Sequence, residues 1–338
     1  MKALVCKTPG ALEYIEVQMP ALKKEHSILK INSVGICGTD YHAFDGTQPY
    51  FEYPRILGHE ISAEIADTEP DSGFVIGEKV TVSPYFYCGK CIACRSHKTN
   101  CCEQLQVLGV HTDGAMCSYI LVPDYSIISG NKLREDELVL VEPLAIGAHG
   151  ISRAQIKQGE FILVMGAGPI GIATMNFAII AGAKVIAMDK NQKRLDFCKN
   201  KLGIPYTINP DEDDIIEKLR EFTNKDMPTV ILDCTGNIKA INNAVNYLAH
   251  GGRFVIIGLQ KEEISINHPG FHKKEATLMS SRNALPEDFK HVISCIQNGK
   301  IKTKDYITHR LKFGDPNLSF TNQDQTLIKA ILVLDDEI

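Results

Sequence analysis

The chain has 338 residues, 44% of them hydrophobic, and at about 100–200 residues per domain this length predicts two domains with ample cores. With 36 basic and 41 acidic side chains, its net charge is −5. This balance gives no electrostatic reason to bind DNA, RNA or an acidic membrane, so we expect no nucleic acid among its partners.

The first part of the chain, to about Leu144, contains short β-type segments separated by glycine, proline and aspartate. This spacing predicts a mostly antiparallel β domain with loops. Examples of the expected strands are Ser27–Val34, Ile61–Ala66, Lys79–Val82 and Tyr119–Val122.

Beyond Leu144, strand-like and helix-like segments alternate, as they do in parallel βαβ units. The acidic segment Asp211–Glu221 predicts a solvated helix with one buried face rather than a binding site. After Ser281 the pattern is mixed again, and we expect this C-terminal segment to return to the first domain. The predicted strands are Phe161–Met165, Lys184–Asp189, Thr229–Cys234, Arg253–Ile257 and Ala330–Leu334, and the predicted helices are Ile170–Ala181, Gln192–Leu202, Ile238–His250 and Pro286–Asn298.

One uncharged segment, Phe161–Ala183, is long enough to span a bilayer. Glycines and a proline interrupt it, and no positively charged cluster flanks it. A buried strand followed by a buried helix explains the same composition, so we expect no membrane partner.

A glycine-rich turn at residues 166–171 fits the pattern G-x-G-x-x-G between a predicted strand and a predicted helix. The first glycine permits a tight turn, the second lets a pyrophosphate approach the backbone, and the third lets helix and strand pack closely. The helix N-terminus supplies N–H donors to the phosphates. The alternative is a glycine-rich turn in an ordinary α/β domain. We predict a dinucleotide site formed by Gly166, Gly168, Pro169, Ile170 and Gly171.

Asp189 ends the next predicted strand, eighteen residues after Gly171. A carboxylate at this place accepts hydrogen bonds from the adenosine ribose hydroxyls and repels a 2′-phosphate, which favours NAD over NADP. The nearby cations Lys190, Lys193 and Arg194 act against this preference.

Eleven cysteines is a high count for a chain of this length. Residues Met1 to Pro9 have no long apolar core and no small-residue cleavage site, so they do not resemble a signal peptide. Without secretion, clustered cysteines indicate metal ligands rather than a disulfide framework, and we expect a cytoplasmic protein.

Four of the cysteines are spaced as Cys88-x2-Cys91-x2-Cys94-x7-Cys102. Four thiolates at this spacing can close tetrahedrally around a structural Zn²⁺. The alternative is an iron–sulfur cluster, but such motifs typically continue with a three-residue gap and Cys-Pro, whereas the gap here is seven residues. Zinc is therefore favoured, with Cys101 as a spare neighbour.

A second set of candidate ligands is dispersed, with Cys37 in GICGTD, His59 and Glu60 in GHE, and Glu142 in VEPL. Spacing alone does not join these residues. Taken singly, a cysteine such as Cys37 is more often a small buried hydrophobe, and a histidine such as His59 is more often a hydrogen-bonded core residue.

Together these motifs resemble the zinc-containing, medium-chain alcohol dehydrogenase superfamily. The resemblance implies an α/β protein in which a GroES-like, mostly-β catalytic domain (1–143 plus 282–338) flanks a doubly wound Rossmann NAD-binding domain (144–281). The segments that carry it follow the family's order over essentially the whole chain: VGICGTDYH (34–42), YPRILGHE (53–60), the four-cysteine segment, VEPLAIGAH (141–149) and GAGPIG (166–171).

The same resemblance implies two zinc ions with different roles. A structural zinc is expected at Cys88, Cys91, Cys94 and Cys102. The catalytic zinc is expected at Cys37, His59 and Glu60, with Glu142 as a second acidic group that can exchange as a ligand.

Roles in proton transfer and cofactor binding also follow from the resemblance. Thr39 and His42 match a hydroxyl and imidazole proton relay. Asp189 and Arg194 match adenosine-ribose contacts. The stretch along the nicotinamide half of the cofactor is matched by Ile257, Gly258 and Leu259.

Finer segments resemble the sugar-acid and polyol branch, and most of all L-galactonate 5-dehydrogenase-like enzymes. The branch implies a zinc- and NAD(P)-dependent transfer of hydride from a secondary alcohol to NAD. It also implies a small, polar, hydroxylated substrate and a homodimer or homotetramer. These segments are KTNCCE (98–103), GVHTDG (109–114), FHKKE (271–275) and SRNALPEDF (281–289).

Other functions remain open from the sequence. The ligand set would serve an L-threonine 3-dehydrogenase or a sorbitol-type dehydrogenase equally well. From other classes, an iron–sulfur electron carrier and a non-catalytic NAD-binding relative are the alternatives. A sugar-acid substrate would also need a cation for its carboxylate, for which the candidates are Arg55, Lys273, Lys274 and Arg282.

Overall fold

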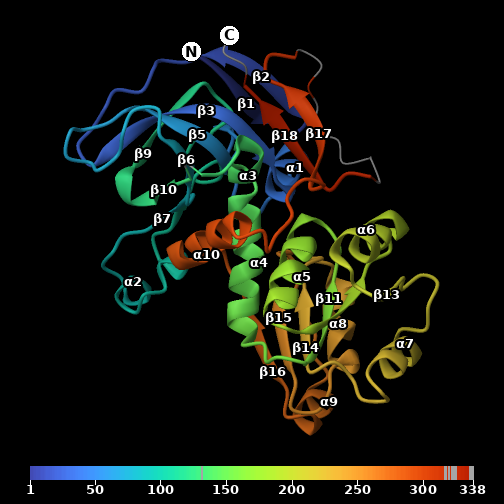
Figure 1. The fold of residues 1–338 in the computed structure, drawn as a ribbon. Coiled ribbons are helices and arrows are strands. Elements are labelled where there is room, and N and C mark those ends of the chain that lie inside the picture. The colour runs from blue at the N-terminus through green and yellow to red at the C-terminus, as the bar shows by residue number, and fades with distance from the viewer. Residues whose placement is uncertain (131, 316–317, 319, 321–325, 335–338) are drawn as a thin grey trace. The chain divides into compact units, whose positions relative to one another are not determined.

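The structure, a computed structural model, describes residues 1–130, 132–315, 318, 320 and 326–334. Its ribbon is shown in Figure 1. The chain forms two compact units, of which unit 1 is Met1–Glu142 with Leu285–Ile338 and unit 2 is Pro143–Ala284.

Unit 1 is built mainly from antiparallel strands, as predicted. Its largest sheet has the order β10-β6-β5-β3-β18-β17, and β9 also pairs with β3. Smaller sheets of order β2-β1-β4 and β7-β8 complete the unit. The strands are β1 (Lys2–Thr8), β2 (Ala11–Glu16), β3 (His26–Ile36), β4 (Arg55–Ile56), β5 (Glu60–Asp67), β6 (Lys79–Val82), β7 (Tyr85–Phe86), β8 (Gln106–Val107), β9 (Tyr119–Pro123), β10 (Ile127–Ser129), β17 (Ile307–Lys312) and β18 (Lys329–Val333).

Short helices and one longer helix lie between these strands in the sequence. The C-terminal strand β18 pairs antiparallel with β3, with Ala330 opposite Ile36, so the last described strand lies beside an early one. Apolar side chains of β1, β3, β5 and β18 form one core, in which Leu4, Leu29, Ile61 and Leu332 are buried. The helices are α1 (Gly38–Phe44), α2 (Ile92–Arg95), α3 (Glu135–Leu138), α10 (Pro286–Gln297), and the 3-10 helices η1 (Thr99–Cys101) and η2 (Asp124–Ser126).

Unit 2 contains a six-stranded, fully parallel sheet of order β13-β12-β11-β14-β15-β16. This is the doubly wound order, in which the strand sequence reverses beside β11 and creates a place for a ligand at the carboxyl ends of the strands. The strands are β11 (Phe161–Met165), β12 (Lys184–Met188), β13 (Tyr206–Ile208), β14 (Val230–Asp233), β15 (Arg253–Ile256) and β16 (Thr277–Ser280).

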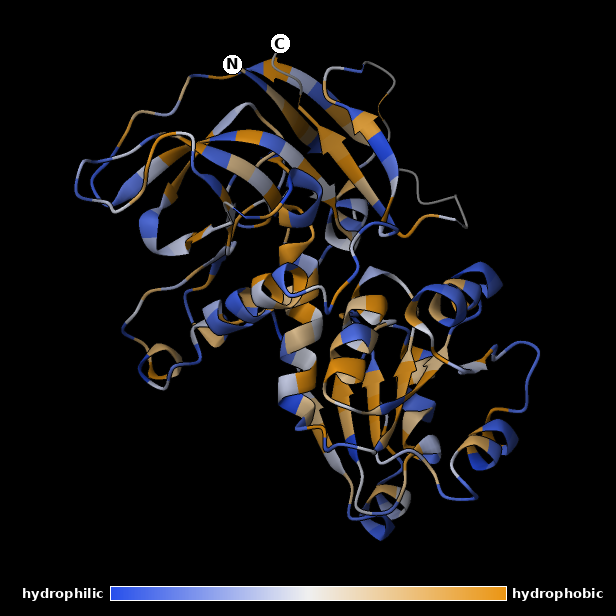
Figure 2. Cartoon of the chain, viewed as in Figure 1, coloured by the Kyte–Doolittle hydropathy of each residue, from blue (hydrophilic) through white to orange (hydrophobic). Residues whose placement is uncertain are grey.

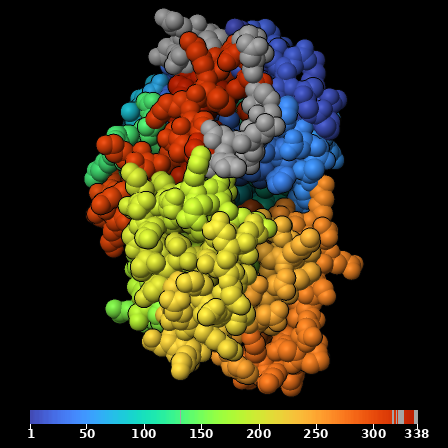
Figure 3. Space-filling view, turned by 90° about the vertical axis from the view of Figure 1, so that its right-hand side faces the viewer, coloured from blue at the N-terminus to red at the C-terminus, as the bar shows by residue number. Residues whose placement is uncertain are grey.

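The central strands of this sheet are apolar along their length, because helices cover them. Figure 2 shows them in orange, and α5 packs on β11 and β12. In the space-filling view, the yellow and orange segments that follow β12 form the face of unit 2 turned to the viewer (Figure 3). The helices are α5 (Pro169–Ile180), α6 (Gln192–Leu202), α7 (Ile215–Phe222), α8 (Ile238–Asn243), η3 (Ala244–Tyr247) and α9 (His268–Lys273), while α4 (Val141–Ala154) begins at the boundary of the units.

The uncharged segment predicted as a strand and a helix forms β11 and α5. Within the described ranges, the structure holds no helix with the length and apolar character needed to cross a membrane.

Two helix predictions in unit 2 are wrong in extent. The acidic helix expected at Asp211–Glu221 begins only at Ile215, because the Asp214 side chain caps it by accepting a hydrogen bond from Glu217 N at 3.0 Å. The helix expected at Ile238–His250 ends at Asn243 and continues as 3-10 helix. There, Lys274 Nζ donates to the carbonyls of Val245 and Leu248, each at 2.6 Å, and so satisfies groups that a longer helix would pair internally.

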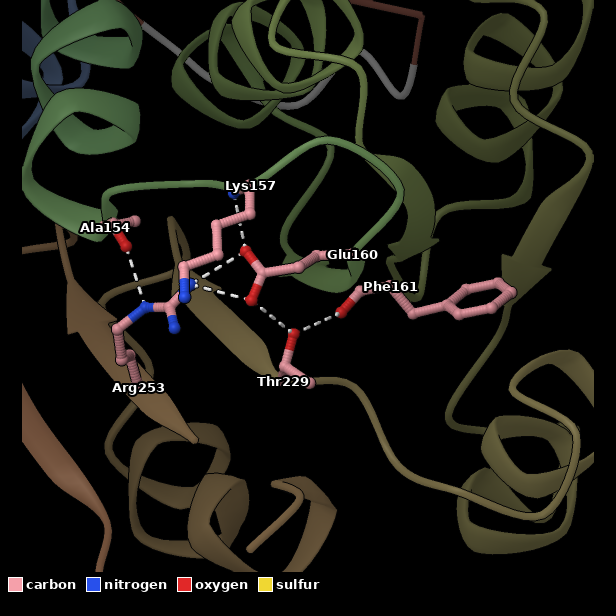
Figure 4. A network of polar contacts seen from close by, with 6 residues as sticks. All are labelled: Ala154, Lys157, Glu160, Phe161, Thr229 and Arg253. Carbon is pink, nitrogen blue, oxygen red and sulfur yellow. Dashed lines mark hydrogen bonds and ion pairs between the residues drawn. The ribbon is translucent and has the colours of Figure 1, made fainter. Parts of the chain in front are cut away.

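A polar network fixes the amino ends of the strands of unit 2 (Figure 4). The Glu160 carboxylate accepts from Arg253 Nη2 at 2.8 and 3.0 Å, from Lys157 N at 2.7 Å and from Thr229 Oγ1 at 3.1 Å. Arg253 Nε also donates to Ala154 O at 2.8 Å, at the end of α4. The network therefore stabilises the sheet at the amino-terminal ends of its strands, opposite the carboxyl ends where a ligand would bind.

Candidate functional site

The four predicted thiols meet in one small lobe between β7 and β8. The Sγ atoms of Cys88, Cys91, Cys94 and Cys102 lie within 4.8 Å of one another. Separations of 3.5, 3.9 and 4.0 Å between pairs of sulfurs are close to the edge of about 3.8 Å that a tetrahedron with Zn–S bonds of about 2.3 Å requires. The geometry therefore fits one tetrahedral metal ion.

Backbone N–H groups surround these sulfurs. Cys88 N and Gln104 N each donate to Cys102 Sγ at 3.3 Å, and Cys91 N donates to Cys88 Sγ at 3.4 Å. The N–H groups of Cys94 and Glu103 lower the pKa of Cys91 to about 6, which favours the thiolate that a metal binds. Cys101, the expected spare, is exposed, and all eleven cysteines lie in the described part of the chain as free thiols.

The second predicted group is brought together by strand pairing. β3 ends at Ile36, just before Cys37, and β5 begins at Glu60, just after His59. Because Gly35 pairs antiparallel with Glu60, the end of one strand lies beside the start of the other. The ligand atoms of Cys37, His59 and Glu60 consequently lie within 4.8 Å of one another, with His59 and Glu60 buried.

This second group also fits a metal ion chemically. One thiol, one imidazole and one carboxylate form a donor set that binds Zn²⁺ and leaves a fourth position open. Nδ1 of His59 is buried and has no hydrogen-bond partner among the described residues, as expected of a ring nitrogen whose partner is not protein. Negative neighbours, Cys37 first, overcome burial and raise the pKa of His59 well above its usual value.

Asp40 holds the two ligand-bearing segments against each other. Its carboxylate is fully buried and accepts from Cys37 N at 2.8 Å and from Gly58 N at 3.2 Å. One acceptor thus fixes the backbone beside both Cys37 and His59. The price of this placement is desolvation, which raises the pKa of Asp40.

Lys329 pairs with the third predicted ligand. Its Nζ donates to both oxygens of Glu60, at 2.6 and 2.7 Å, and to Ile36 O at 3.2 Å. Lys329 and Glu60 are 3% and 0% exposed. Although burial alone would lower the pKa of Lys329, the charges of Glu60 and Cys37 raise it.

Space around Glu60 is tight. A Cβ on Gly35 would lie 2.0 Å from Glu60 Oε2, so only glycine fits at this position of β3. The glycine of the GIC motif therefore makes room for the carboxylate.

Glu142, the second predicted carboxylate, lies in the first turn of α4 and is 3% exposed. Its Oε1 accepts a hydrogen bond from the hydroxyl of Tyr85. Burial, together with the charge of Glu60, raises the pKa of Glu142 to about 7, although His59 opposes the shift. The charges of His59 and Glu60 therefore act on Glu142, but Glu142 is not one of the three ligands that the structure groups together.

The expected relay residues lie on α1, the helix that begins after Cys37. Thr39 is half-buried and His42 is exposed. His42 Nδ1 is bonded to Thr47 Oγ1 at 2.9 Å rather than to Thr39. The relay from Thr39 to His42 stays a prediction.

The glycine turn of unit 2 has the conformation that a dinucleotide needs. Gly166 has a φ of +93°, and a Cβ on Gly171 would lie 1.8 Å from Gly166 O, so neither position accepts a side chain. Gly168 caps α5 without a side chain, and Pro169 occupies the first turn of that helix. The N–H groups of the helix start thus face no capping side chain and suit a phosphate.

Asp189 follows β12 directly and is tied to this turn. Its Oδ2 accepts from Ala167 N at 2.6 Å and its Oδ1 accepts from Asn191 N at 2.8 Å. A Cβ on Gly168 would lie 3.7 Å from Arg194 Nη1. The turn, the acid and the arginine are therefore neighbours, as the sequence predicts for one ribose and phosphate site.

The stretch from Ile257 to Leu259 leaves the carboxyl end of β15. Ile257 N and Gly258 N both donate to Asp233 O, and a Cβ on Gly258 would lie 2.2 Å from Gly236 N. Leu259 is 60% exposed. This stretch lies at the same edge of the sheet as the glycine turn, because parallel strands end together.

Three residues of these sites escaped the sequence analysis. Asp40 could have been found as the N3 residue of a capping box whose N-cap is Cys37. Lys329 reads in the sequence as the polar boundary of an apolar strand, and Tyr85 as an ordinary aromatic of a short strand. Their partners, Glu60 and Glu142, are far from them in the sequence, so no local signal existed.

Comparisons with known proteins agree with this geometry. Two family models match: zinc-binding dehydrogenase over residues 169–298 and alcohol dehydrogenase GroES-like domain over residues 23–132. L-galactonate-5-dehydrogenase of Escherichia coli K12 is 41% identical over 315 residues, which cover 93% of this chain and 92% of that protein. Sorbitol dehydrogenase of Halalkalibacterium halodurans is 33% identical over 324 residues, which cover 93% and 94%.

Among solved structures, RspB of Escherichia coli CFT073, described as a short chain alcohol dehydrogenase and complexed with the cofactor NADH, has a TM-score of 0.90. It is 30% identical, and the match covers 98% of this chain and 99% of that one.

The fold and the two ligand groups define a zinc-type, NAD(P)-dependent alcohol or polyol dehydrogenase. The predicted fold class and enzyme class are thereby confirmed. The chain belongs to the zinc-binding medium-chain dehydrogenase superfamily, in its sugar-acid and polyol branch.

Proposed function

We propose that the protein oxidises a secondary alcohol of a sugar acid, of the L-galactonate type, and transfers the hydride to NAD. The observation that carries this proposal is the meeting of Cys37, His59 and Glu60 in a chain that is 41% identical to L-galactonate-5-dehydrogenase. The proposal assigns a catalytic zinc to this group and a structural zinc to the four-cysteine lobe. It also includes the functional domains 1–143 with 282–338 and 144–281, a cytoplasmic location and a homodimer or homotetramer.

Zinc, when bound, supplies a Lewis acid that brings the pKa of an alcohol towards neutrality, and NAD accepts the hydride. Cys37, His59 and Glu60 would hold the metal through sulfur, nitrogen and oxygen. Asp40 keeps the backbones of the first two ligands together, and Lys329 orients the third. Glu142 adds a carboxylate that can hold a substrate hydroxyl or a water at the open side.

The proton released from the alcohol needs a path to solvent. The Thr39 hydroxyl, at the start of α1, is proposed to take part in this transfer, and His42 to pass the proton on. His42 is exposed and its Nδ1 already bonds to Thr47, which fixes the imidazole ring for exchange with water.

For the cofactor, the proposal assigns NAD rather than NADP. The Asp189 carboxylate is anchored by two backbone N–H groups, so it is preorganised to accept from ribose hydroxyls and to repel a 2′-phosphate. Of the nearby cations, Lys190 pairs with Asp211 at 2.9 Å, which reduces its attraction for a phosphate.

The structure helps to choose among the candidate cations for the carboxylate of a sugar-acid substrate. Lys274 Nζ donates to the backbone carbonyls of Val245, Asn246 and Leu248. Its ammonium therefore stabilises the fold rather than binding a substrate. Arg55 lies in the same unit as the Cys37 group, with its Nη1 3.5 Å from Asp113. Arg55 is thus preferred over Lys274 for this role.

The test is NAD⁺ reduction by the purified protein with L-galactonate, with polyols that include sorbitol, and with L-threonine. Chelator-treated enzyme is the control. Turnover of L-galactonate that chelation abolishes supports the proposal. If only a polyol or threonine reacts, the zinc and NAD chemistry stands and the substrate assignment fails.

The cofactor assignment is tested in the same assay. Asp189→Ser should reduce the ratio of NAD⁺ to NADP⁺ efficiency, because it removes both the hydroxyl acceptor and the repulsion. An unchanged ratio would contradict the role of Asp189.

A further inference from the structure

Tyr85 joins two parts of unit 1 that the sequence keeps apart. The four-cysteine lobe begins three residues later, at Cys88, while the Tyr85 hydroxyl donates to Oε1 of Glu142. Tyr85 is 5% exposed and Glu142 is 3% exposed. The hydrogen bond is therefore shielded from water, which makes it costly to lose.

The ring of Tyr85 is held on several sides. In the β7–β8 pairing, Tyr85 lies opposite Val107. Leu108 N donates to Pro84 O at 3.0 Å, and the ring of Phe289 on α10 packs edge-on at 6.3 Å between ring centroids. The hydroxyl accordingly has one defined position.

The lobe controls this position because it is the connection between β7 and β8. Residues Cys88 to Cys102 close on themselves through four sulfurs, and Cys88 N also donates to Cys102 Sγ. Closing the lobe fixes the distance between its two ends and so the pairing of the strands that flank it. An open lobe would release Tyr85 from that pairing.

Glu142 responds to Tyr85 because few other groups compete for it. His59, Glu60 and Lys329 act on the charge of Glu142, and the Tyr85 hydroxyl donates a hydrogen bond to it. Without the hydroxyl, a buried carboxylate would turn towards the positive charges beside it. With a metal at Cys37, His59 and Glu60, the strongest of these charges would be the metal.

We propose that Tyr85 is a positioning residue that holds Glu142 beside the catalytic metal group but outside its resident ligands, and that the closed four-cysteine lobe holds Tyr85 in place. The lobe then serves more than stability, since it sets the orientation of a carboxylate at the reaction site. The part of this inference that concerns turnover rests on the proposed function, whereas its spectroscopic part does not.

The first variant to test is Tyr85→Phe, which removes only the hydroxyl. The matched control is Tyr87→Phe, the same change two residues along, where the ring packs on Tyr125 at 4.8 Å between ring centroids. Each protein is prepared with zinc in the lobe and cobalt in the Cys37 group, because the visible bands of Co²⁺ report its ligands.

We expect Tyr85→Phe to shift the cobalt spectrum, since Glu142 enters the coordination sphere, and to lower kcat about 10- to 100-fold. The metal content should stay at two ions per chain. Tyr87→Phe should match the wild type in both respects. An unchanged spectrum and kcat in Tyr85→Phe would overturn the role of Tyr85.

A cycle with Glu142→Gln separates positioning from mere stability. If Tyr85 acts through Glu142, adding Tyr85→Phe to Glu142→Gln changes the spectrum and kcat little further, because the target is already altered. Additive effects would contradict the proposal. Should the wild type oxidise no alcohol, the proposed function fails, but the cobalt spectra still decide the question for Tyr85.

The contribution of the lobe is tested with Cys91→Ser. The variant should reproduce the cobalt shift of Tyr85→Phe, and the double variant should show no additional shift. A wild-type spectrum in Cys91→Ser would overturn the lobe's part. If Cys91→Ser does not fold, hydrogen exchange at the amide of Leu108, which donates to Pro84 O beside Tyr85, is measured in metal-depleted wild type instead, and unchanged protection would overturn the same claim.

Discussion

The two ligand groups of unit 1 are assembled in different ways. The lobe takes four thiols from residues 88–102, a single short segment whose own N–H groups bond to the sulfurs. The other group takes Cys37, His59 and Glu60 from two strand ends and depends on Lys329, which is 269 positions from Glu60 in the sequence. The first group is local and the second exists only in the folded unit.

The groups differ equally in what surrounds them. Four thiolates saturate a tetrahedral ion, so the lobe leaves no place for a substrate. The Cys37 group offers three ligands and has charged or polar partners around it, namely Asp40, Lys329 and Glu142. A metal ion with four protein ligands suits a structural role, whereas a metal ion with three protein ligands and an open position suits catalysis.

The largest expected effect follows from removing a ligand of the open group. Cys37→Ser should lower turnover by at least about 10³-fold, because the Lewis acid supplies several kcal/mol of transition-state stabilisation. Zinc should fall from two ions per chain to one, measured on the same preparation. Full zinc content together with full activity would remove Cys37 from the site.

The next effect tests the long-range support of that group. Lys329→Met leaves the Glu60 charge buried without its partner and should lower the free energy of unfolding by about 3–5 kcal/mol. Denaturant unfolding measures it. As a control, Lys7→Met breaks the exposed pair with Glu13 and should cost less than about 1 kcal/mol. Equal losses of unfolding free energy in the two variants would show that burial does not determine how much the Lys329–Glu60 pair contributes to stability.

Unit 2 contains a partly buried ion pair between Glu160 and Arg253. Burial opposes ionisation of Glu160, but the Lys157 N–H and Arg253 outweigh it and lower the pKa of Glu160. Its stabilisation is therefore present above about pH 4.3, the usual pKa of glutamate, and is lost as the pH falls through the lowered pKa.

Glu160→Gln should accordingly destabilise the protein by about 1–3 kcal/mol at neutral pH. The difference from wild type should shrink as the pH falls below about 4, when the native carboxylate also takes up a proton. Unfolding measured from pH 7 to pH 3 checks this. If the difference in the free energy of unfolding between wild type and Glu160→Gln grew towards low pH, the stabilising role of the Glu160 carboxylate would be contradicted.

The smallest effect concerns neighbouring cysteines of the lobe. Cys101→Ser changes an exposed thiol outside the cluster and should alter stability by less than about 0.5 kcal/mol, with both zinc ions kept. Cys102→Ser, one position along, should lose one zinc. If Cys101→Ser loses zinc as well, the lobe uses a different ligand set.

The contrast between the groups also explains what the sequence could predict. The cysteine spacing and the glycine turn are local, so the residues that lie together in the fold are already close in the chain. Joining Cys37 to His59 required the pairing of β3 with β5, for which spacing gave no signal, and the resemblance to a family supplied it instead. Lys329 and Tyr85 depend on tertiary contacts alone, and neither source pointed to them.

The predicted bounds of two helices were wrong for a related reason. At Asp214 a side-chain cap, and at residues 244–247 the ammonium of Lys274, decide where a helix begins or changes character. Periodicity of apolar residues does not report such contacts.

The most direct test is the zinc content of wild type, Cys37→Ser and Cys102→Ser, measured beside NAD⁺ reduction with the best alcohol substrate. We expect two ions in wild type and one in each variant. Turnover should vanish in Cys37→Ser without loss of the folded state, while Cys102→Ser should keep the zinc of the Cys37 group. One zinc in wild type, or turnover that survives in Cys37→Ser, would contradict the assignment of a separate catalytic metal at Cys37, His59 and Glu60.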